Sequence, residues 1–425
     1  MAATLFLAFF GLVAIGVPIA IALGLASMIA MQAFSHVPVM VLVQKAYSGL
    51  DTFTLMAIPF FILAGNVMSQ GGVSTRLVAL ANIFFGRFTG GLAHVSTAAC
   101  TFFGAISGSA PATTAAIGSV MVPPMKAKGY STEFAAANIA ASGVIGLLIP
   151  PSITMVLYGV ITGASIGKMF LGGIVPGLIM SGALMIVNYF VAKKHGFRGE
   201  NPPTAAAAWV AVKESFFAML MPVIILGGIY GGVFTPTESA VVAAAYGLIV
   251  GAFIYKEMTL KKLKATIMQT AKSSAIIMIL VSLAHCFSYI LASEQIPQAI
   301  ADKMLQITRE PNMLLLLICA CLLIVGTFLD NAVAVVLMTP ILYPVTMSAG
   351  IDPVFFGVLL VLTLAIGQIT PPVGLCLFVA CNIAGISIEK LSYSCIPYIF
   401  TMLVVMLIIL FFPDLVLFIP NQVEL

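Results

Sequence analysis

The sequence predicts an all-α integral membrane protein built from two inverted repeats, each with a re-entrant hairpin and a broken transmembrane helix. The prediction depends on the composition, on a motif pattern that occurs twice, and on the charge of the loops. Of 425 residues, 61% are hydrophobic and 8% are charged, whereas soluble globular domains carry roughly a quarter charged residues. So much apolar surface cannot be hidden from water, so the chain's solvent is lipid and its spans are helices.

The composition and the missing motifs exclude other classes of protein. The net charge is +4, but no basic run is interleaved with aromatic residues, so the sequence does not predict nucleic-acid binding. The seven cysteines lie in apolar stretches and are typical of packing thiols. Walker A, H-E-x-x-H and G-x-S-x-G motifs are all missing, so we do not expect an enzyme. The first 25 residues lack a charged leader region and a cleavage site, which favours a membrane segment over a cleaved signal.

The candidate spans are apolar stretches of about 20 residues, the length that crosses a bilayer as a helix. The clear ones are 50–69, 169–192, 214–232, 238–255, 265–292 and 393–419. The opening stretch 2–34 is long for one helix and short for two, with Gly16-Val-Pro18 in its middle. If the repeat symmetry holds, it forms two short spans.

Four further apolar stretches are interrupted near their midpoints. Stretches 88–127 and 311–349 carry Gly, Ser, Asp, Asn or Pro there, which predicts re-entrant hairpins that enter and leave on one side. Stretches 131–162 and 353–386 are interrupted by Pro-Pro, which predicts broken helices.

The same motifs occur twice, in the same order. Ile145-Gly-Leu-Leu-Ile-Pro-Pro151 is repeated as Ile366-Gly-Gln-Ile-Thr-Pro-Pro372, and Gly163-Ala-Ser-Ile-Gly-Lys-Met169 corresponds to Gly385-Ile-Ser-Ile-Glu-Lys-Leu391. Ile62-Leu-Ala-Gly65 corresponds to Ile290-Leu-Ala-Ser293, and the polar midpoint at Ser107 corresponds to the one at Asp330. We therefore expect an N-terminal repeat at 1–205 and a C-terminal repeat at 206–425.

Loop charges predict the orientation, because cytoplasmic loops carry an excess of Lys and Arg. Basic residues flank the first hairpin and fill the central linker and the next loop: Arg76, Arg87, Lys126, Lys128, Lys193, Lys194, Arg198, Lys213, Lys256, Lys261, Lys262 and Lys264. Around the second hairpin, acidic residues offset the basic ones: Asp302, Glu310 and Asp352 against Lys303 and Arg309. The first hairpin should therefore open to the cytoplasm and the second to the periplasm.

The four breaks are the predicted functional sites. A helix interrupted inside the membrane leaves C=O groups that bind cations and N–H groups that bind anions. The predicted cation ligands are Ser107, Ser109, Gly146 and Pro150 at the first clamp, and Asp330, Asn331, Gly367 and Thr370 at the second. The predicted contacts to a substrate anion are Ser109, Thr113, Ser152, Asn331 and Gly374. Hard oxygen ligands suit Na⁺ by the logic that suits Ca²⁺ and Mg²⁺.

Structural alternatives exist for each of these residues. A single Gly or Ser in a membrane helix more often serves helix packing, and Asp330 could cap the second arm of its hairpin while also binding an ion. The four breaks taken together, at matched repeat positions, favour function. Inverted repeats with broken helices are an architecture of secondary transporters.

The chain resembles the large membrane subunit of tripartite ATP-independent periplasmic (TRAP) transporters. The resemblance covers Gly11–Ala20, Ile58–Gly65, Gly104–Thr114, Ile149–Ser152, Phe234–Glu238 and Thr370–Gly374. It implies an elevator-type ion transporter fold in the bacterial inner membrane and uptake driven by Na⁺. It also implies a small four-helix membrane subunit and a periplasmic substrate-binding protein as partners.

The implied substrates are organic acids, among them C4-dicarboxylates and sialic acids, with a slight preference for sialic acid from overall likeness. Two alternatives remain at this point. One is a stand-alone ion-coupled carrier or antiporter of the same fold. The other is an intramembrane enzyme or an assembly scaffold.

Overall fold

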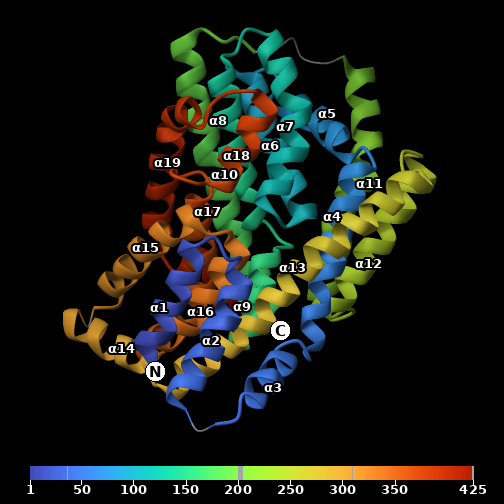
Figure 1. Cartoon of the computed structure of the whole chain (residues 1–425). Coiled ribbons are helices and arrows are strands. Elements are labelled where there is room, and N and C mark those ends of the chain that lie inside the picture. The colour runs from blue at the N-terminus through green and yellow to red at the C-terminus, as the bar shows by residue number, and fades with distance from the viewer. Residues whose placement is uncertain (36, 200–203, 309, 424–425) are drawn as a thin grey trace.

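The computed structural model describes residues 1–35, 37–199, 204–308 and 310–423, and its described secondary structure is helical throughout (Figure 1). Eight of the described helices or helix pairs are long and apolar enough to cross a membrane. The chain is therefore an all-α membrane protein, as the composition predicts.

The elements follow one another along the chain as α1 (Ala2–Ala14), α2 (Ile19–Phe34), α3 (Met40–Ser48), η1 (Phe53–Met56), α4 (Ala57–Gln70), α5 (Val73–Phe85), α6 (Gly91–Ser107), α7 (Ala110–Ala127), α8 (Thr132–Gly143), η2 (Val144–Leu147), α9 (Ile153–Thr162), α10 (Ile166–His195), α11 (Ala205–Tyr230), α12 (Pro236–Ile249), a π-helical turn η3 (Val250–Ile254), α13 (Leu260–Ser293), α14 (Ile296–Ile307), α15 (Pro311–Phe328), α16 (Asn331–Ser348), α17 (Pro353–Gly367), α18 (Leu375–Ala384), α19 (Ile388–Phe411), α20 (Asp414–Leu417) and η4 (Pro420–Gln422).

The two predicted hairpins are present and point in opposite directions. Helices α6 and α7 form the first hairpin, and α15 and α16 form the second. In Figure 1 the first hairpin occupies the upper part of the molecule and the second the lower part. The broken helices are α8–η2 followed by α9, and α17 followed by α18.

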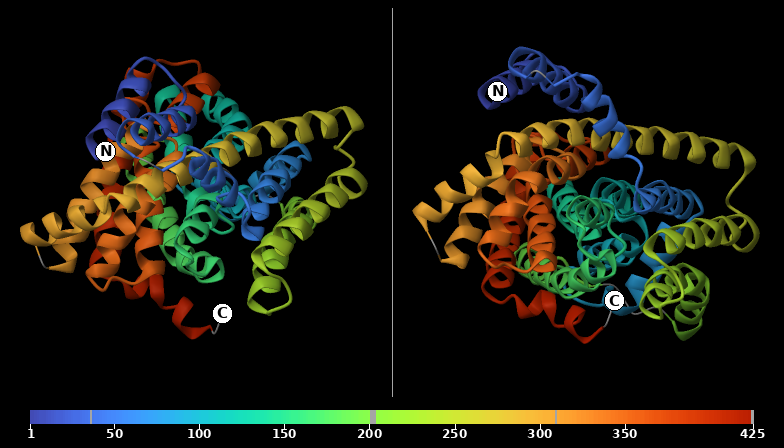
Figure 2. Two further views of the ribbon diagram at one scale, coloured as in Figure 1. Left: turned by 60° about the horizontal axis from the view of Figure 1, so that its bottom comes forward. Right: turned by 90° about the horizontal axis from the view of Figure 1, so that it is seen from below.

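The hairpins and broken helices lie beside a frame of outer helices. Figure 2 shows the N-terminal helices and α13 along one side of the central elements and α11 and α12 along another. Within this frame α12 packs on α4, and α13 packs on α2 and α4. Helix α13 has 34 residues, about 51 Å at 1.5 Å per residue. A bilayer core of about 30 Å is shorter than this, so α13 must either tilt or extend beyond the hydrocarbon region.

Several boundaries differ from those predicted. The opening stretch forms the two short helices α1 and α2. The last span was predicted at 393–419, but its helix runs from Ile388 to Phe411, because Pro413 follows and cannot continue a helix. Helices α3, α5 and α14 were not predicted, since each is shorter than a span.

The local ends of the broken helices repeat from one half of the chain to the other. Gly163 ends α9 and Gly385 ends α18, both in the left-handed conformation with φ of 76° and 71°. A glycine is the residue that adopts this conformation without strain. Two residues later, Ser165 and Ser387 occupy the N-cap positions of α10 and α19.

The loops predicted to be cytoplasmic lie close to one another. Arg76 forms an ion pair of 2.7 Å with Glu257, which joins α5 to the loop before α13. The rings of Tyr130 and Phe197 stack at 4.2 Å, so the base of the first hairpin meets the start of the central linker. Two predicted features, Arg309 and linker residues 200–203, lie outside the described residues. The division into 1–205 and 206–425 stays a prediction.

Candidate functional site

The first hairpin tip docks on the first broken helix through backbone contacts. A Cβ atom at Gly104 would lie 2.7 Å from Gly146 Cα, so only glycine allows this approach. At the tip itself Gly108 is left-handed, with φ of 61°, and its carbonyl accepts from Ile153 N at 3.4 Å. A Cβ at Gly108 would lie 2.6 Å from the carbonyl oxygen of Pro151. The tip is therefore held against the break by its glycines.

A cluster of hydroxyl and carbonyl oxygens lies at this first tip. Ser107 Oγ and Thr113 Oγ1 are 2.7 Å apart, and Thr113 Oγ1 donates to Ser109 O at 2.8 Å. A Cβ at Gly146 would lie 2.6 Å from Thr113 Oγ1, so the break directly faces the cluster. Ser107 and Thr113 are both buried. Neutral oxygens thus gather where the first cation clamp was predicted, with Thr113 among them.

The second tip docks on the second broken helix in the same way. A Cβ at Gly326 would lie 3.3 Å from Gly367 Cα, and one at Gly367 would lie 2.6 Å from Gly326 Cα. Gly374 N donates to Thr327 O at 3.3 Å, which parallels the bond between Ile153 and Gly108 in the first half.

The second tip differs from the first in its polar groups. Asp330 is the N-cap of α16, and its Oδ2 accepts from Ala332 N at 3.1 Å. Gln368 Nε2 donates to Asn331 Oδ1 at 2.9 Å, which ties the tip to the broken helix. Asn331 Nδ2 is buried and has no hydrogen-bond partner among the described residues. An unpaired buried donor is costly unless something occupies the space beside it.

The two tips meet at one small cavity of about 90 Å³. From the first half it is lined by Gly108, Ser109, Pro111, Leu147, Ile153 and Thr154, from the second half by Asp330, Asn331, Ala332 and Gln368, and from the outer helix α13 by Ile277. Both tips, both broken helices and the frame therefore contribute to a single site.

The structure brings some of the predicted site residues to this cavity and leaves others nearby. Ser109, Asp330 and Asn331 line it. Ser152 instead caps α9 and hydrogen-bonds Thr154 Oγ1 at 2.9 Å, and Thr370 Oγ1 donates to Ile366 O at 2.8 Å.

The breaks themselves hold the remaining predicted residues. Gly367 and Gly374 pack against the second hairpin, and at the first break it is the carbonyl of Pro151, next to Pro150, that faces Gly108.

The other cavity-lining residues were not assigned from the sequence, among them Thr154, Gln368 and Ile277. Gln368 carried a signal, because a polar side chain next to a break in an apolar stretch is rarely without a role. Ile277 carried none, because it is one of many aliphatic residues on α13.

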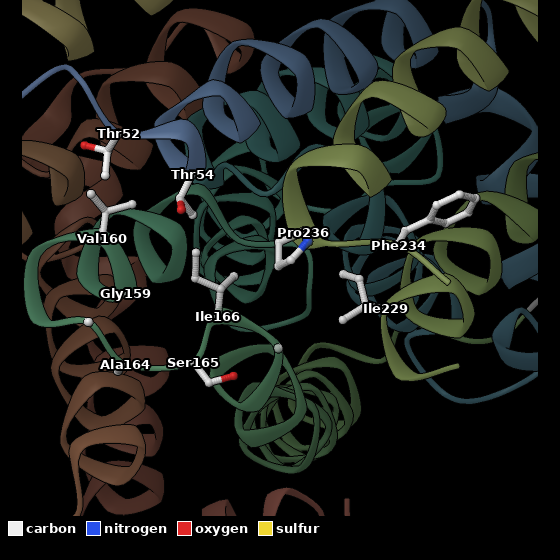
Figure 3. A pocket seen from close by; sticks show the side chains of 12 residues that line it. Thr52, Thr54, Gly159, Val160, Ala164, Ser165, Ile166, Ile229, Phe234 and Pro236 are labelled. Atoms are coloured by element: carbon white, nitrogen blue, oxygen red, sulfur yellow. The ribbon is translucent and has the colours of Figure 1, made fainter. Parts of the chain in front are cut away.

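A second hollow, of about 470 Å³, lies between the frame and the first broken helix. Figure 3 shows Thr52, Thr54, Ile229 and Pro236 of the frame near the turn that joins α9 to α10. Its lining residues include no ionisable side chain, so its chemistry differs from that of the central cavity.

Comparison with known proteins places these features in context. A family model described as "Tripartite ATP-independent periplasmic transporter, DctM component" matches residues 6–415. The isethionate TRAP transporter permease protein DctMQ of Oleidesulfovibrio alaskensis is 46% identical over 405 residues, which are 95% of this chain and 64% of that protein. This chain thus spans less than two thirds of the length of that relative.

Two other relatives match over most of both chains. The C4-dicarboxylate TRAP transporter large permease protein DctM of Rhodobacter capsulatus is 37% identical over 420 residues, 96% of each chain. The sialic acid TRAP transporter large permease protein SiaM of Vibrio cholerae is 38% identical over 378 residues, 89% of this chain and 88% of that protein. Among solved structures, the YdaH transporter of Alcanivorax borkumensis has a TM-score of 0.62 and 16% identity, covering 87% of this chain and 86% of its own, which is a likeness of fold.

Proposed function

We propose that this chain, which belongs to the DctM component family of tripartite ATP-independent periplasmic transporters, takes up a small organic anion together with Na⁺. It is a multi-pass protein of the bacterial inner membrane and a transporter permease, not an enzyme. Its relatives carry names for isethionate, C4-dicarboxylate and sialic acid transport. The proposed cargo is an organic acid of this kind.

The observation that carries the proposal is the meeting of both hairpin tips at one cavity. Each tip approaches its own broken helix through a pair of glycines, so backbone groups of the breaks lie beside polar side chains. Such half-helix ends are where secondary transporters hold ions and substrates. Because both halves line this one cavity, a substrate bound there would contact both hairpin tips.

The coupling ions would be held at the two tips. The first clamp offers Ser107 Oγ, Thr113 Oγ1 and Ser109 O, which lie within hydrogen-bond distance of one another. The second offers the Asp330 carboxylate beside Asn331. These are hard oxygen donors, the type that Na⁺ prefers. Cations at both clamps would lower the electrostatic cost of an anion between them.

We further propose an elevator-type movement, in which the hairpins and broken helices move as one body against the frame. The frame helices pack on one another, and the hollow in Figure 3 is lined by Thr54 and Pro236 of the frame and by Val160 of the broken-helix half α9. A hollow at this boundary gives the two parts room to shift. Ile277 of the frame lines the central cavity and would then contact the cargo in only one position.

The proposed partners are a small four-helix membrane subunit and a periplasmic binding protein that delivers the substrate, in keeping with membership of a tripartite family. The alternative is a stand-alone ion-coupled carrier or antiporter of the same fold.

Reconstitution tests the proposal. The membrane subunits are placed in liposomes and given labelled organic anions, with a Na⁺ or a choline gradient, and with or without the binding protein. We expect uptake only when Na⁺ and the binding protein are both present. Full-rate uptake without the binding protein would establish the stand-alone alternative. Equal uptake with a Na⁺ and with a choline gradient would refute the coupling of transport to Na⁺.

A further inference from the structure

The central cavity is small for a transporter of sugar acids. Its volume is about 90 Å³, whereas sites for drug-sized molecules are typically about 300 to 1,000 Å³. Buried residues from both breaks form part of its wall, among them Leu147, Ile153 and Gln368. A sialic acid, a bulky sugar acid with a glycerol side chain and an acetamido group, is much larger than the space that the two tips enclose here.

The charges around the cavity favour a substrate with one negative charge. Asp330 is the one ionisable side chain among the lining residues, which include no Lys or Arg. Two coupling cations, one at each clamp, would offset Asp330 and a single charge on the substrate. A second charge would remain without a fixed partner, and an unpaired buried charge is strongly destabilising.

One residue that lines this cavity carries a hydrogen-bond donor without a partner among the described residues. Asn331 lines it, is 3% exposed, and its Nδ2 atom has no partner among the described residues. Gln368 Nε2 donates to the other end of the same amide, Asn331 Oδ1, at 2.9 Å. This bond fixes which end of the Asn331 amide accepts and leaves Nδ2 free to donate to an acceptor oxygen.

We propose that the central cavity selects a small monoanion, of the size of a hydroxyalkyl sulfonate or a short hydroxy acid, and that Gln368 is a positioning residue that orients Asn331 Nδ2 toward its oxygens. The inference rests on the proposed transport function and narrows its substrate class. It argues against the sialic acid preference and against C4-dicarboxylates for this chain.

Substrate selection is tested by thermal stability of the assembled permease, without the binding protein, so that the cavity itself is measured. The probes are isethionate, lactate, succinate and N-acetylneuraminate, each in Na⁺ and in choline. We expect isethionate or lactate to raise the melting temperature only in Na⁺. Equal or greater stabilisation by succinate or N-acetylneuraminate would overturn the size and charge inference while leaving Na⁺-dependent binding intact. If none of the four anions stabilises the permease, the proposed anion site itself is refuted.

The role of Gln368 is tested by a double-mutant cycle. Gln368→Met keeps the length of the side chain but cannot donate, and Asn331→Ala removes the proposed donor. We expect each change to weaken binding of the stabilising monoanion about tenfold, roughly 1.4 kcal/mol. Gln368→Met should do so without changing the Na⁺ concentration that stabilises the anion-free protein.

If Gln368 acts through Asn331, the double variant should bind no more weakly than Asn331→Ala alone. Additive losses would show that Gln368 acts independently and refute the positioning role. Gln368→Leu provides a second non-donating, uncharged variant in case Gln368→Met does not fold, and it should weaken binding to a similar extent.

Discussion

The two hairpin tips use the same backbone arrangement in different surroundings. Around the first tip, the break from Gly146 to Ser152 is buried throughout, and the polar groups are neutral hydroxyls. Around the second, Pro371 and Pro372 are exposed, Phe328 at the end of the entering arm is 58% exposed, and the tip carries the carboxylate of Asp330. The carboxylate is visible when the two midpoints are aligned, but the difference in exposure is not visible in the Pro-Pro motif that the two halves share.

The difference shows how one repeat can serve two tasks. A carboxylate inside a membrane protein is costly unless polar groups or a cation compensate its charge. The second tip carries such a charge on Asp330, whereas the first tip relies on neutral oxygens that need no counter-ion. We therefore expect changes at the second tip to alter the Na⁺ dependence of uptake strongly, and changes at the first tip to alter it only moderately.

The largest expected effect concerns the opposite orientation of the two hairpins. Ala127→Cys and Ser348→Cys place single cysteines at the ends of α7 and α16, both exposed, in a background without other cysteines. A membrane-impermeant thiol reagent should label one only from the cytoplasm and the other only from the periplasm. Labelling of both cysteines from the same side would show that the two hairpins are not inverted.

The next effect concerns the glycine contacts that dock each tip. Gly367→Ala would place a Cβ 2.6 Å from Gly326 Cα, and Gly104→Ala would place one 2.7 Å from Gly146 Cα. Forcing extra volume into such contacts costs typically about 1 to 3 kcal/mol. We expect each variant to lower the uptake rate at least tenfold. Gly182→Ala is the matched control, because nothing lies within 4 Å of its Cβ, and it should keep the parental rate.

The smallest effect separates the two cation clamps. Asp330→Asn keeps an oxygen that can accept from Ala332 N but removes the charge. We expect it to raise the Na⁺ concentration for half-maximal uptake about tenfold or more, since each tenfold is about 1.4 kcal/mol.

Ser107→Ala at the first tip should raise the same Na⁺ concentration only a few-fold, because Thr113 Oγ1 and Ser109 O remain and one neutral hydrogen-bonding group contributes about 1 kcal/mol. The measurement is uptake rate against Na⁺ concentration, with protein amount in the membrane as the control for folding. Parental Na⁺ dependence in both variants would make the tips packing elements.

Local features of the fold could be predicted because they depend on short stretches of sequence. The Pro-Pro pairs and the polar midpoints located both breaks and both hairpins, and the capping box of Thr235 and Glu238 begins α12 where the sequence places a helix start. One boundary was missed although its signal is local. The span was predicted at 265–292, but Thr259 caps α13 by accepting from Lys262 N at 3.3 Å, so the helix begins at Leu260.

By itself the sequence determined the class of protein, the repeat and the polar residues at the breaks, because lipid as solvent leaves an apolar chain few choices beyond helices, and each interruption must carry its own polar groups. Only the tertiary structure decided that Ser109 and Asn331 share one cavity, that Gln368 holds the Asn331 amide, and that Ile277 of the frame completes the wall. These are contacts between segments distant in the chain. They follow from how the helices pack, which no local pattern of residues specifies.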